Sequence, residues 1–164
     1  LDGEGTVREA LRDQYTTLEE GKADILGLYL VTQLKEMGEM DIDLMDNYTT
    51  FLAGIFRSIR FGSSSAHGKA NLIRFNYFKE MNAFIYNEET GKYKVDFENI
   101  KKAVNALSEK ILTLQGDGNY QNVDDFVMKY ANIPPDLQLV LDDLSDKKIP
   151  VDVKFVQGTN ILGL

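Results

Sequence analysis

Cysteine is absent from the 164-residue sequence, and histidine occurs only once, at His67. The lack of cysteine excludes disulfide bonds, thiolate zinc sites and cysteine nucleophiles. No run rich in lysine and arginine is present to follow a phosphate backbone, and the net charge is -8 with a pI near 4.7. No apolar run reaches the roughly 18 residues that a membrane span needs. We therefore expect neither a nucleic-acid nor a membrane partner.

The composition that remains is typical of a folded globular protein. Hydrophobic residues make up 43% of the sequence and charged residues 27%, and the length suffices for one hydrophobic core. The sequence begins at Leu1 without an initiator methionine, so we expect it to be a piece of a longer protein. These features leave the compartment open, with a cytoplasmic location favoured as the default.

Hydrophobic periodicity predicts a mainly α fold. Alternating residues around a turn at 89–91 predict a β-hairpin over 83–97, and a second alternating segment, 149–156, predicts an edge strand. The predicted helices cover residues 6–15, 18–37, 43–61, 66–84, 97–114, 123–131 and 134–144. The expected architecture is a single multi-helix domain, 1–164, with one small β-hairpin and a short C-terminal strand.

Several of these helices carry signals for their N-terminal ends. A Ser/Thr-x-x-Glu capping box is expected at the start of the second helix. Serines in 63–65 and Asp96 are expected to cap the fourth and fifth helices, and composition makes 115–122 a loop. The pairs that fit the capping box are Thr17 with Glu20 and Thr16 with Glu19.

Two acids near the start of the second helix lie on a face that becomes partly apolar. Glu20 and Asp24 are four residues apart, so their carboxylates project from one side of the helix and repel each other. In one interpretation both acids face water and are favoured by the helix dipole. In the other interpretation, a cation lies beside them. Leu28 and Val31 support this second interpretation, because they continue the same face and make it partly apolar.

The segment "LEEGKADILGLYLV" (18–31) resembles the glutamate motif of the dipeptidyl peptidase III family of zinc metallopeptidases, EECRAE followed by an apolar helix. This resemblance implies that Glu20 is a zinc ligand, that Glu19 is a neighbour of the site, and that Asp24 replaces the family's final glutamate. A carboxylate from one helix can complete a zinc site with three protein ligands, and an acid one turn further on can orient a ligating imidazole.

A second segment, "SSSAHGKANLIRFNYF" (63–78), resembles a later part of the same family in which an Ala-His pair opens a helix of the active-site cleft. The resemblance gives His67 the role of contacting the substrate carbonyl or the oxyanion that develops from it. Where the family often carries an arginine, this chain has Asn71, with Arg74 nearby. A third segment, "KKIPVDVKF" (147–155), is similar to a segment of bacterial relatives.

The family's zinc-binding HExxGH or HExxxH motif cannot lie in this sequence, because that motif needs two histidines. We therefore expect a zinc peptidase that acts on peptide substrates as the parent protein. The 164 residues alone are expected to be inactive and to hold no tightly bound zinc. The missing segment is expected to leave an apolar cleft wall exposed, which favours self-association.

Two other functions compete with the peptidase interpretation. A non-catalytic helical interaction module would use the acids as caps and an apolar face to bind a partner helix. A calcium loop over 115–126 would use Asp117, Asn119 and Gln121, but it lacks the glycine and closing glutamate of an EF-hand. No Gly-x-Ser-x-Gly, Walker or dinucleotide-binding motif is present.

Overall fold

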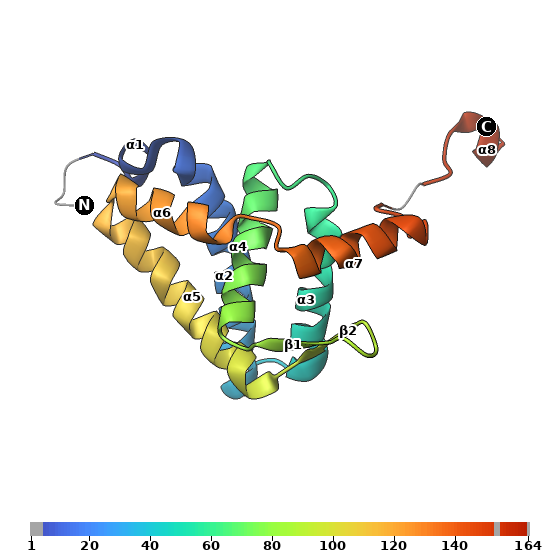
Figure 1. Cartoon of the computed structure of the whole chain (residues 1–164), viewed down its shortest axis with the longest axis horizontal. Helices are drawn as coiled ribbons and strands as arrows, with labels where there is room; N and C mark the ends of the chain where they lie inside the picture. Colours follow the sequence, from blue (N-terminus) through green and yellow to red (C-terminus); the bar gives the residue numbers. More distant parts are fainter. Residues whose placement is uncertain (1–4, 153–154, 164) are drawn as a thin grey trace.

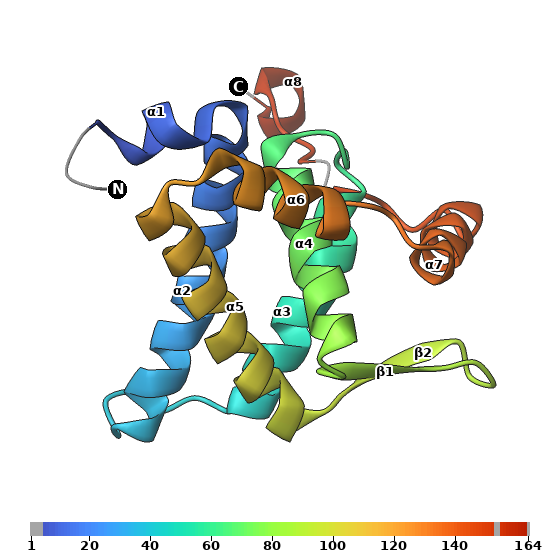
Figure 2. The ribbon, with the colours of Figure 1, turned by 60° about the vertical axis from the view of Figure 1, so that its left-hand side comes forward.

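Helix α4 runs through the middle of the helical bundle, and consecutive residues 70–75 on it are all buried. A helix that is buried on every side occupies a core position. The computed structural model describes residues 5–152 and 155–163 (Figure 1). Four helices surround α4 (Figure 2). The bounds are α4 (Ala66–Glu80), α2 (Tyr15–Glu36), α3 (Leu44–Ile59), α5 (Phe97–Asp117) and α6 (Tyr120–Tyr130).

The smaller elements lie at the periphery of this bundle. Two strands form the predicted antiparallel hairpin, with Phe84 opposite Val95 and Asn87 opposite Lys92. The mainly α fold with one two-stranded hairpin is therefore confirmed. These elements are α1 (Val7–Leu11), the 3₁₀ turn η1 (Arg12–Gln14), β1 (Phe84–Asn87), β2 (Lys92–Val95), α7 (Pro135–Asp146) and α8 (Thr159–Leu162).

Two of the predicted caps are present, but the capping box at the second helix is wrong. The Ser65 and Asp96 side chains accept hydrogen bonds from backbone N–H groups in the first turns of α4 and α5. Helix α2 instead begins at Tyr15, with no side-chain cap, because η1 leads directly into it. Thr17 is buried inside the helix, and the capping box is formed by Thr6 with Glu9 at α1.

Several predicted boundaries also differ from the structure, among them the end of the helix over 66–84, which the structure places at Glu80. The expected helix over 6–15 is interrupted at Arg12, whose φ of 50° is in the left-handed region and ends α1. The expected loop over 115–122 is much shorter. Helix α5 continues to Asp117 and ends at Gly118, with φ 65°, and Asn119 caps α6. The residues proposed for a calcium loop thus lie in two helices and the cap between them.

The predicted C-terminal strand is not found in the described residues of its segment, 149–152 and 155–156, while Val153 and Lys154 lie outside the described residues. This segment is held by side chains of α3 instead of by a strand partner. Arg57 binds Asp152 at 2.7 Å, and Arg60 donates to the Ile149 carbonyl at 2.6 Å. Pro150 also lacks the N–H group that a sheet ladder requires.

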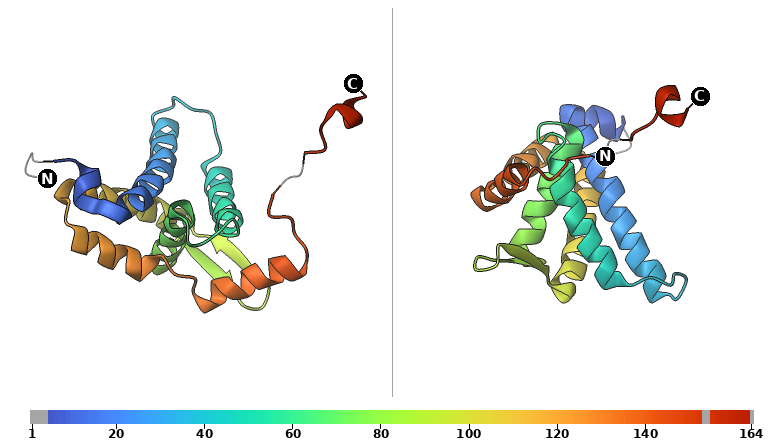
Figure 3. Two further views of the ribbon diagram at one scale, coloured as in Figure 1. Left: turned by 90° about the horizontal axis from the view of Figure 1, so that it is seen from above. Right: turned by 90° about the vertical axis from the view of Figure 1, so that its right-hand side faces the viewer.

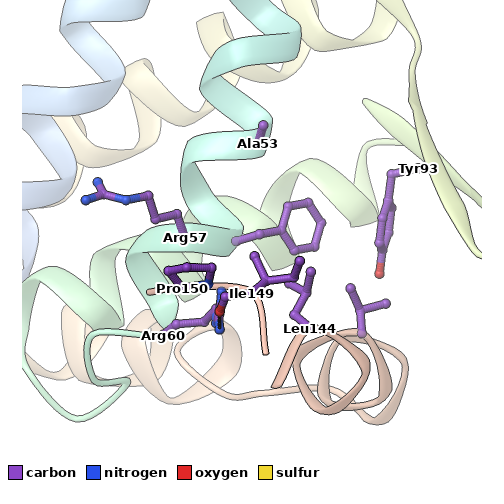
Figure 4. Close-up of a pocket in the computed structure, with 9 residues that line it drawn as sticks. Ala53, Arg57, Arg60, Tyr93, Leu144, Ile149 and Pro150 are labelled. Carbon is purple, nitrogen blue, oxygen red and sulfur yellow. Dashed lines mark hydrogen bonds between the residues drawn. The ribbon is translucent and has the colours of Figure 1, made fainter. Parts of the chain in front are cut away.

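Contacts between α3, α7 and the segment after α7 enclose an apolar hollow of about 370 Å³ (Figure 4). Phe56, Tyr93 and Leu144 line it, and the segment beyond Pro150 then leads away from the bundle toward α8 (Figure 3). None of the predicted site residues lines this hollow. Across residues 5–152 and 155–163, no helix has the length and apolar character needed to cross a membrane.

Candidate functional site

The second turn of α2 and the first turn of α4 face each other and bring two predicted site residues into contact. Nδ1 of His67 lies 3.3 Å from Oε2 of Glu20. Both side chains are about half exposed, at 50% for His67 and 45% for Glu20. A polar contact this exposed contributes little to stability, and it brings both groups together at one accessible place.

Tight packing of the preceding loop fixes where His67 begins its helix. A Cβ atom added to Gly68 would lie 1.9 Å from the carbonyl oxygen of Gly62, so no other residue fits without displacing backbone. The Ser65 hydroxyl donates to the Gly62 carbonyl and accepts from the Gly68 N–H, both at 3.0 Å. The loop and the first turn of α4 are thereby held together, with His67 between them.

Asp24 points toward α4 and pairs with an arginine that is almost completely buried. Oδ2 of Asp24 lies 2.7 Å from a terminal nitrogen, Nη2, of Arg74, whose side chain is 2% exposed. Burial lowers the pKa of the Arg74 guanidinium, and the charge of Asp24 and the hydrogen bond to it oppose that shift. The guanidinium also lies over the Phe51 ring, 5.7 Å from its centre.

Asn71 links the buried Arg74 to the backbone of His67. Its Oδ1 accepts a hydrogen bond from Nη2 of Arg74 at 2.6 Å, and its Nδ2 donates to the His67 carbonyl at 2.9 Å. Asn71 and Arg74 are both 2% exposed, so neither can contact a peptide in this structure. Asn71 stands where the family often carries an arginine, and Arg74 lies nearby. Both side chains instead form contacts inside the protein.

Glu19 faces a different part of the molecule. Its Oε1 accepts hydrogen bonds from Lys22 at 2.6 Å and from Gln115 of α5 at 2.7 Å. Burial raises the pKa of this carboxyl, but the hydrogen bonds from Lys22 and Gln115 outweigh burial and hold the pKa below its ordinary value. Glu19 thus joins α2 to α5, while Glu20 and Asp24 face α4.

The hydrogen-bonded connection from Asp24 through Arg74 and Asn71 to His67 was not predicted from the sequence. A signal for it was available, because Arg74 interrupts the apolar run "LIRF" of the predicted fourth helix. The spacing of three residues between Asn71 and Arg74 places them on one side of that helix.

The donor groups present match part of a zinc site. A carboxylate and an imidazole are groups that zinc prefers, and a catalytic site needs three protein ligands. Within residues 5–152 and 155–163, however, no group of three or more histidine, cysteine, aspartate or glutamate side chains could hold a metal ion. Glu20 can therefore serve as one ligand of a site that these residues do not complete.

No protein-family model matches the chain. Its structure is similar to that of dipeptidyl peptidase III from Caldithrix abyssi, with a TM-score of 0.84 and 38% sequence identity over 90% of this chain. The corresponding structure from Corallococcus sp. strain EGB gives a TM-score of 0.84 and 36% identity over 92%. The predicted resemblance to dipeptidyl peptidase III is confirmed. The chain spans 28% of the length of each of these structures.

A protein from Arabidopsis thaliana is also similar in sequence. It is named Nudix hydrolase 3 and is 41% identical to this chain over 149 residues, which are 90% of this chain and 19% of that protein. That name belongs to a protein of which this chain covers about a fifth. The dipeptidyl peptidase III structure from Caldithrix abyssi also covers 90% of this chain, and there the similarity extends to the three-dimensional structure.

Proposed function

We propose that this chain is the part of a zinc-dependent, dipeptidyl peptidase III-like peptidase that supplies one metal ligand and one substrate-contacting histidine. The observation that carries this proposal is the 3.3 Å contact between Glu20 and His67, two residues selected from separate motifs and 47 positions apart. In the longer protein, the proposed reaction is the release of dipeptides from the N-termini of peptides. The 164 residues alone are expected to be inactive.

In this proposal Glu20 holds zinc together with ligands from outside the described residues. One carboxylate oxygen, Oε2, faces His67, and the other, Oε1, is then available to a cation. Zinc held there would supply a Lewis acid for the scissile carbonyl and would lower the pKa of a bound water molecule. Asp24 is held by Arg74 through Oδ2, so its Oδ1 can accept a hydrogen bond from a metal-ligating imidazole.

His67 is proposed to stabilise the negative charge that develops on the carbonyl oxygen. Because Nδ1 faces Glu20, an imidazolium at this position donates from Nδ1 to the carboxylate and from Nε2 to the substrate oxygen. Such a donor acts most strongly on charge that appears only in the transition state. The half-exposed position of His67 gives a peptide access to it.

The zinc content of the full-length protein tests this assignment. Glu20→Ala is expected to abolish stoichiometric zinc, measured by elemental analysis after dialysis, because a metal ligand is lost. Glu19→Ala is the matched control, since the neighbouring acid faces α5 and is expected to leave zinc in place. Normal zinc content in the Glu20 variant would remove Glu20 as a ligand and with it the proposed role of this chain.

The interaction-module alternative is supported by a separate observation. Leu30, Leu34 and Met37 follow one face of α2 and are 56%, 38% and 71% exposed. If the isolated chain self-associates through this face, Leu30→Glu with Met37→Glu will lower the average mass in a light-scattering concentration series. Leu139→Glu, at a leucine of α7 that is 68% exposed, is the control. A monomeric wild-type chain at every concentration would show that this face of α2 does not bind a second copy of the chain.

A further inference from the structure

Arg74 carries a positive charge in the interior of the protein, where charged side chains are rare. Its side chain is 2% exposed, and in the described part of the chain Nε and Nη1 have no hydrogen-bond partner, although both are buried. Burying a guanidinium costs free energy unless paired groups compensate it. The compensation here comes from Asp24 and Asn71, which both bind the same terminal nitrogen.

The two groups that bind Arg74 each lie one helical turn from a residue of the proposed site. Asp24 lies one helical turn after Glu20 on α2, and Asn71 lies one turn after His67 on α4. Asn71 also bonds the His67 carbonyl at 2.9 Å. A displacement of the guanidinium would therefore be transmitted both to the acidic face of α2 and to the backbone of His67.

The charge of Arg74 also changes the electrostatics of the acidic face. Glu20 and Asp24, four residues apart on α2, repel each other when no cation lies beside them. Arg74 neutralises Asp24 from the interior side and attracts Glu20 as well. Asp24 is thereby held at α4 by one oxygen, while the half-exposed Glu20 lies beside His67 at the surface.

We infer that Arg74 is a positioning residue, which fixes Asp24 and, through Asn71, the backbone of His67, so that Glu20 and His67 are presented to substrate and metal in one fixed arrangement. This inference rests on the proposed function for its catalytic consequence. The inference also states that Arg74 fixes the position of His67 without contacting it. This statement can be tested in the 164-residue chain itself.

The first experiment uses His67 as its own reporter. Because the chain contains one histidine, the imidazole C–H signals in an NMR spectrum belong to that residue alone. At one fixed pH, Arg74→Met is expected to shift and broaden these signals. Arg74→Lys is expected to give a smaller shift, because an ammonium lacks the planar fork of donors. Arg57→Met removes an exposed arginine from α3 and is expected to leave the signals unchanged.

The second experiment measures turnover in the full-length protein. Arg74→Met is expected to lower kcat by about tenfold or more, with KM and zinc content close to wild type, and Arg74→Lys to recover part of the loss. A purely structural role would lower the amount of folded protein instead of kcat per zinc-loaded molecule. If Arg74→Met does not fold, the lysine variant alone decides, because it keeps the buried charge.

The outcomes separate the inference from the proposed function. Wild-type His67 signals in folded Arg74→Lys and Arg74→Met chains would overturn the positioning role, whatever the full-length protein does. Unchanged kcat in the zinc-loaded variants would overturn its catalytic consequence. A full-length wild-type protein without zinc-dependent dipeptide release would instead contradict the proposed function, and the NMR result would still decide the position of His67.

Discussion

Oδ2 of Asp24 and a terminal nitrogen of Arg74 lie 2.7 Å apart, and this pair joins the interiors of α2 and α4 directly beneath the contact between Glu20 and His67. The half-exposed Glu20 and His67 thus lie above a polar layer in which Arg74 and Asn71 are buried and Asp24 is partly exposed. Buried hydrogen-bonded groups of this kind restrict the relative positions of the helices that carry them. We therefore expect substitutions of the surface residues of the site to have different effects from substitutions of the residues beneath them.

A change at the surface is expected to affect turnover. His67→Ala in the full-length protein should lower kcat by about a hundredfold, because one donor to the developing oxyanion is lost. Zinc content should be retained, since the proposed metal ligand, Glu20, is intact. The measurement is steady-state hydrolysis of a dipeptidyl substrate together with metal analysis. Lys69→Ala, on the same turn of α4, controls for helix disturbance, and wild-type kcat in the His67 variant would contradict the assigned role.

The isolated chain is expected to bind zinc weakly. Glu20 and His67 provide two donors at most, and a stable zinc site in a protein requires three or four. Calorimetric titration of the 164-residue chain with zinc at micromolar concentration should therefore show no stoichiometric binding, and dipeptidyl substrates should not be hydrolysed. A tight site with one zinc per chain would show that the described residues suffice for the metal.

The close approach at Gly68 predicts a large stability effect from a single methyl group. Gly68→Ala should destabilise the protein by about 1–3 kcal/mol or more, because the new Cβ would overlap the Gly62 carbonyl oxygen. The matched control is Gly54→Ala in α3, where nothing lies within 4 Å of the added atom. That control should instead stabilise by roughly 0.5–1 kcal/mol, through helix propensity. Urea denaturation of the two variants measures both effects, and equal midpoints would refute the prediction.

Acid should weaken the fold through carboxyls whose pKa is lowered in the folded state. The pKa values of Glu19 and Glu80 lie below their ordinary value of 4.5. A lowered pKa contributes stability above about pH 4.5, and this contribution is lost as the pH falls through the folded-state pKa. Glu19→Gln should therefore reduce the difference between urea midpoints measured near pH 7 and near pH 3.5. Glu39→Gln, in the exposed turn after α2, is the control, and an equal reduction there would contradict the prediction.

Local signals in the sequence were sufficient for most of the helices and for the hairpin. Caps at Ser65 and Asp96 act through side chains a few residues away, so they could be recognised without tertiary information. The errors arose where one element runs into the next. Because η1 leads directly into α2, Thr16 and Thr17 lie within the helix and not at its N-terminal cap. Gly116 contributed to the prediction of a loop, although it lies inside α5.

The site was only partly predictable for a similar reason. Glu20 and His67 were selected from motifs, and their contact depends on how α2 and α4 pack, which a sequence pattern does not specify. The pairing of Asp24 with Arg74 depends on the same packing. Glu19 and Glu20 are adjacent in the sequence, yet the helical turn directs them to α5 and α4 respectively. Spacing predicts which side chains share a face but does not identify the neighbour of that face.

The placement of Glu20 and His67 on two helices packed against each other has a practical consequence for reconstitution. Both groups are already assembled within one polypeptide, so a second polypeptide carrying the remaining metal ligands would need to recognise a single surface to restore activity. Separate expression of this chain and of the remainder of the proposed longer protein, followed by mixing, thus becomes a feasible complementation assay. In such an assay, variants of this chain can be exchanged against an unchanged counterpart.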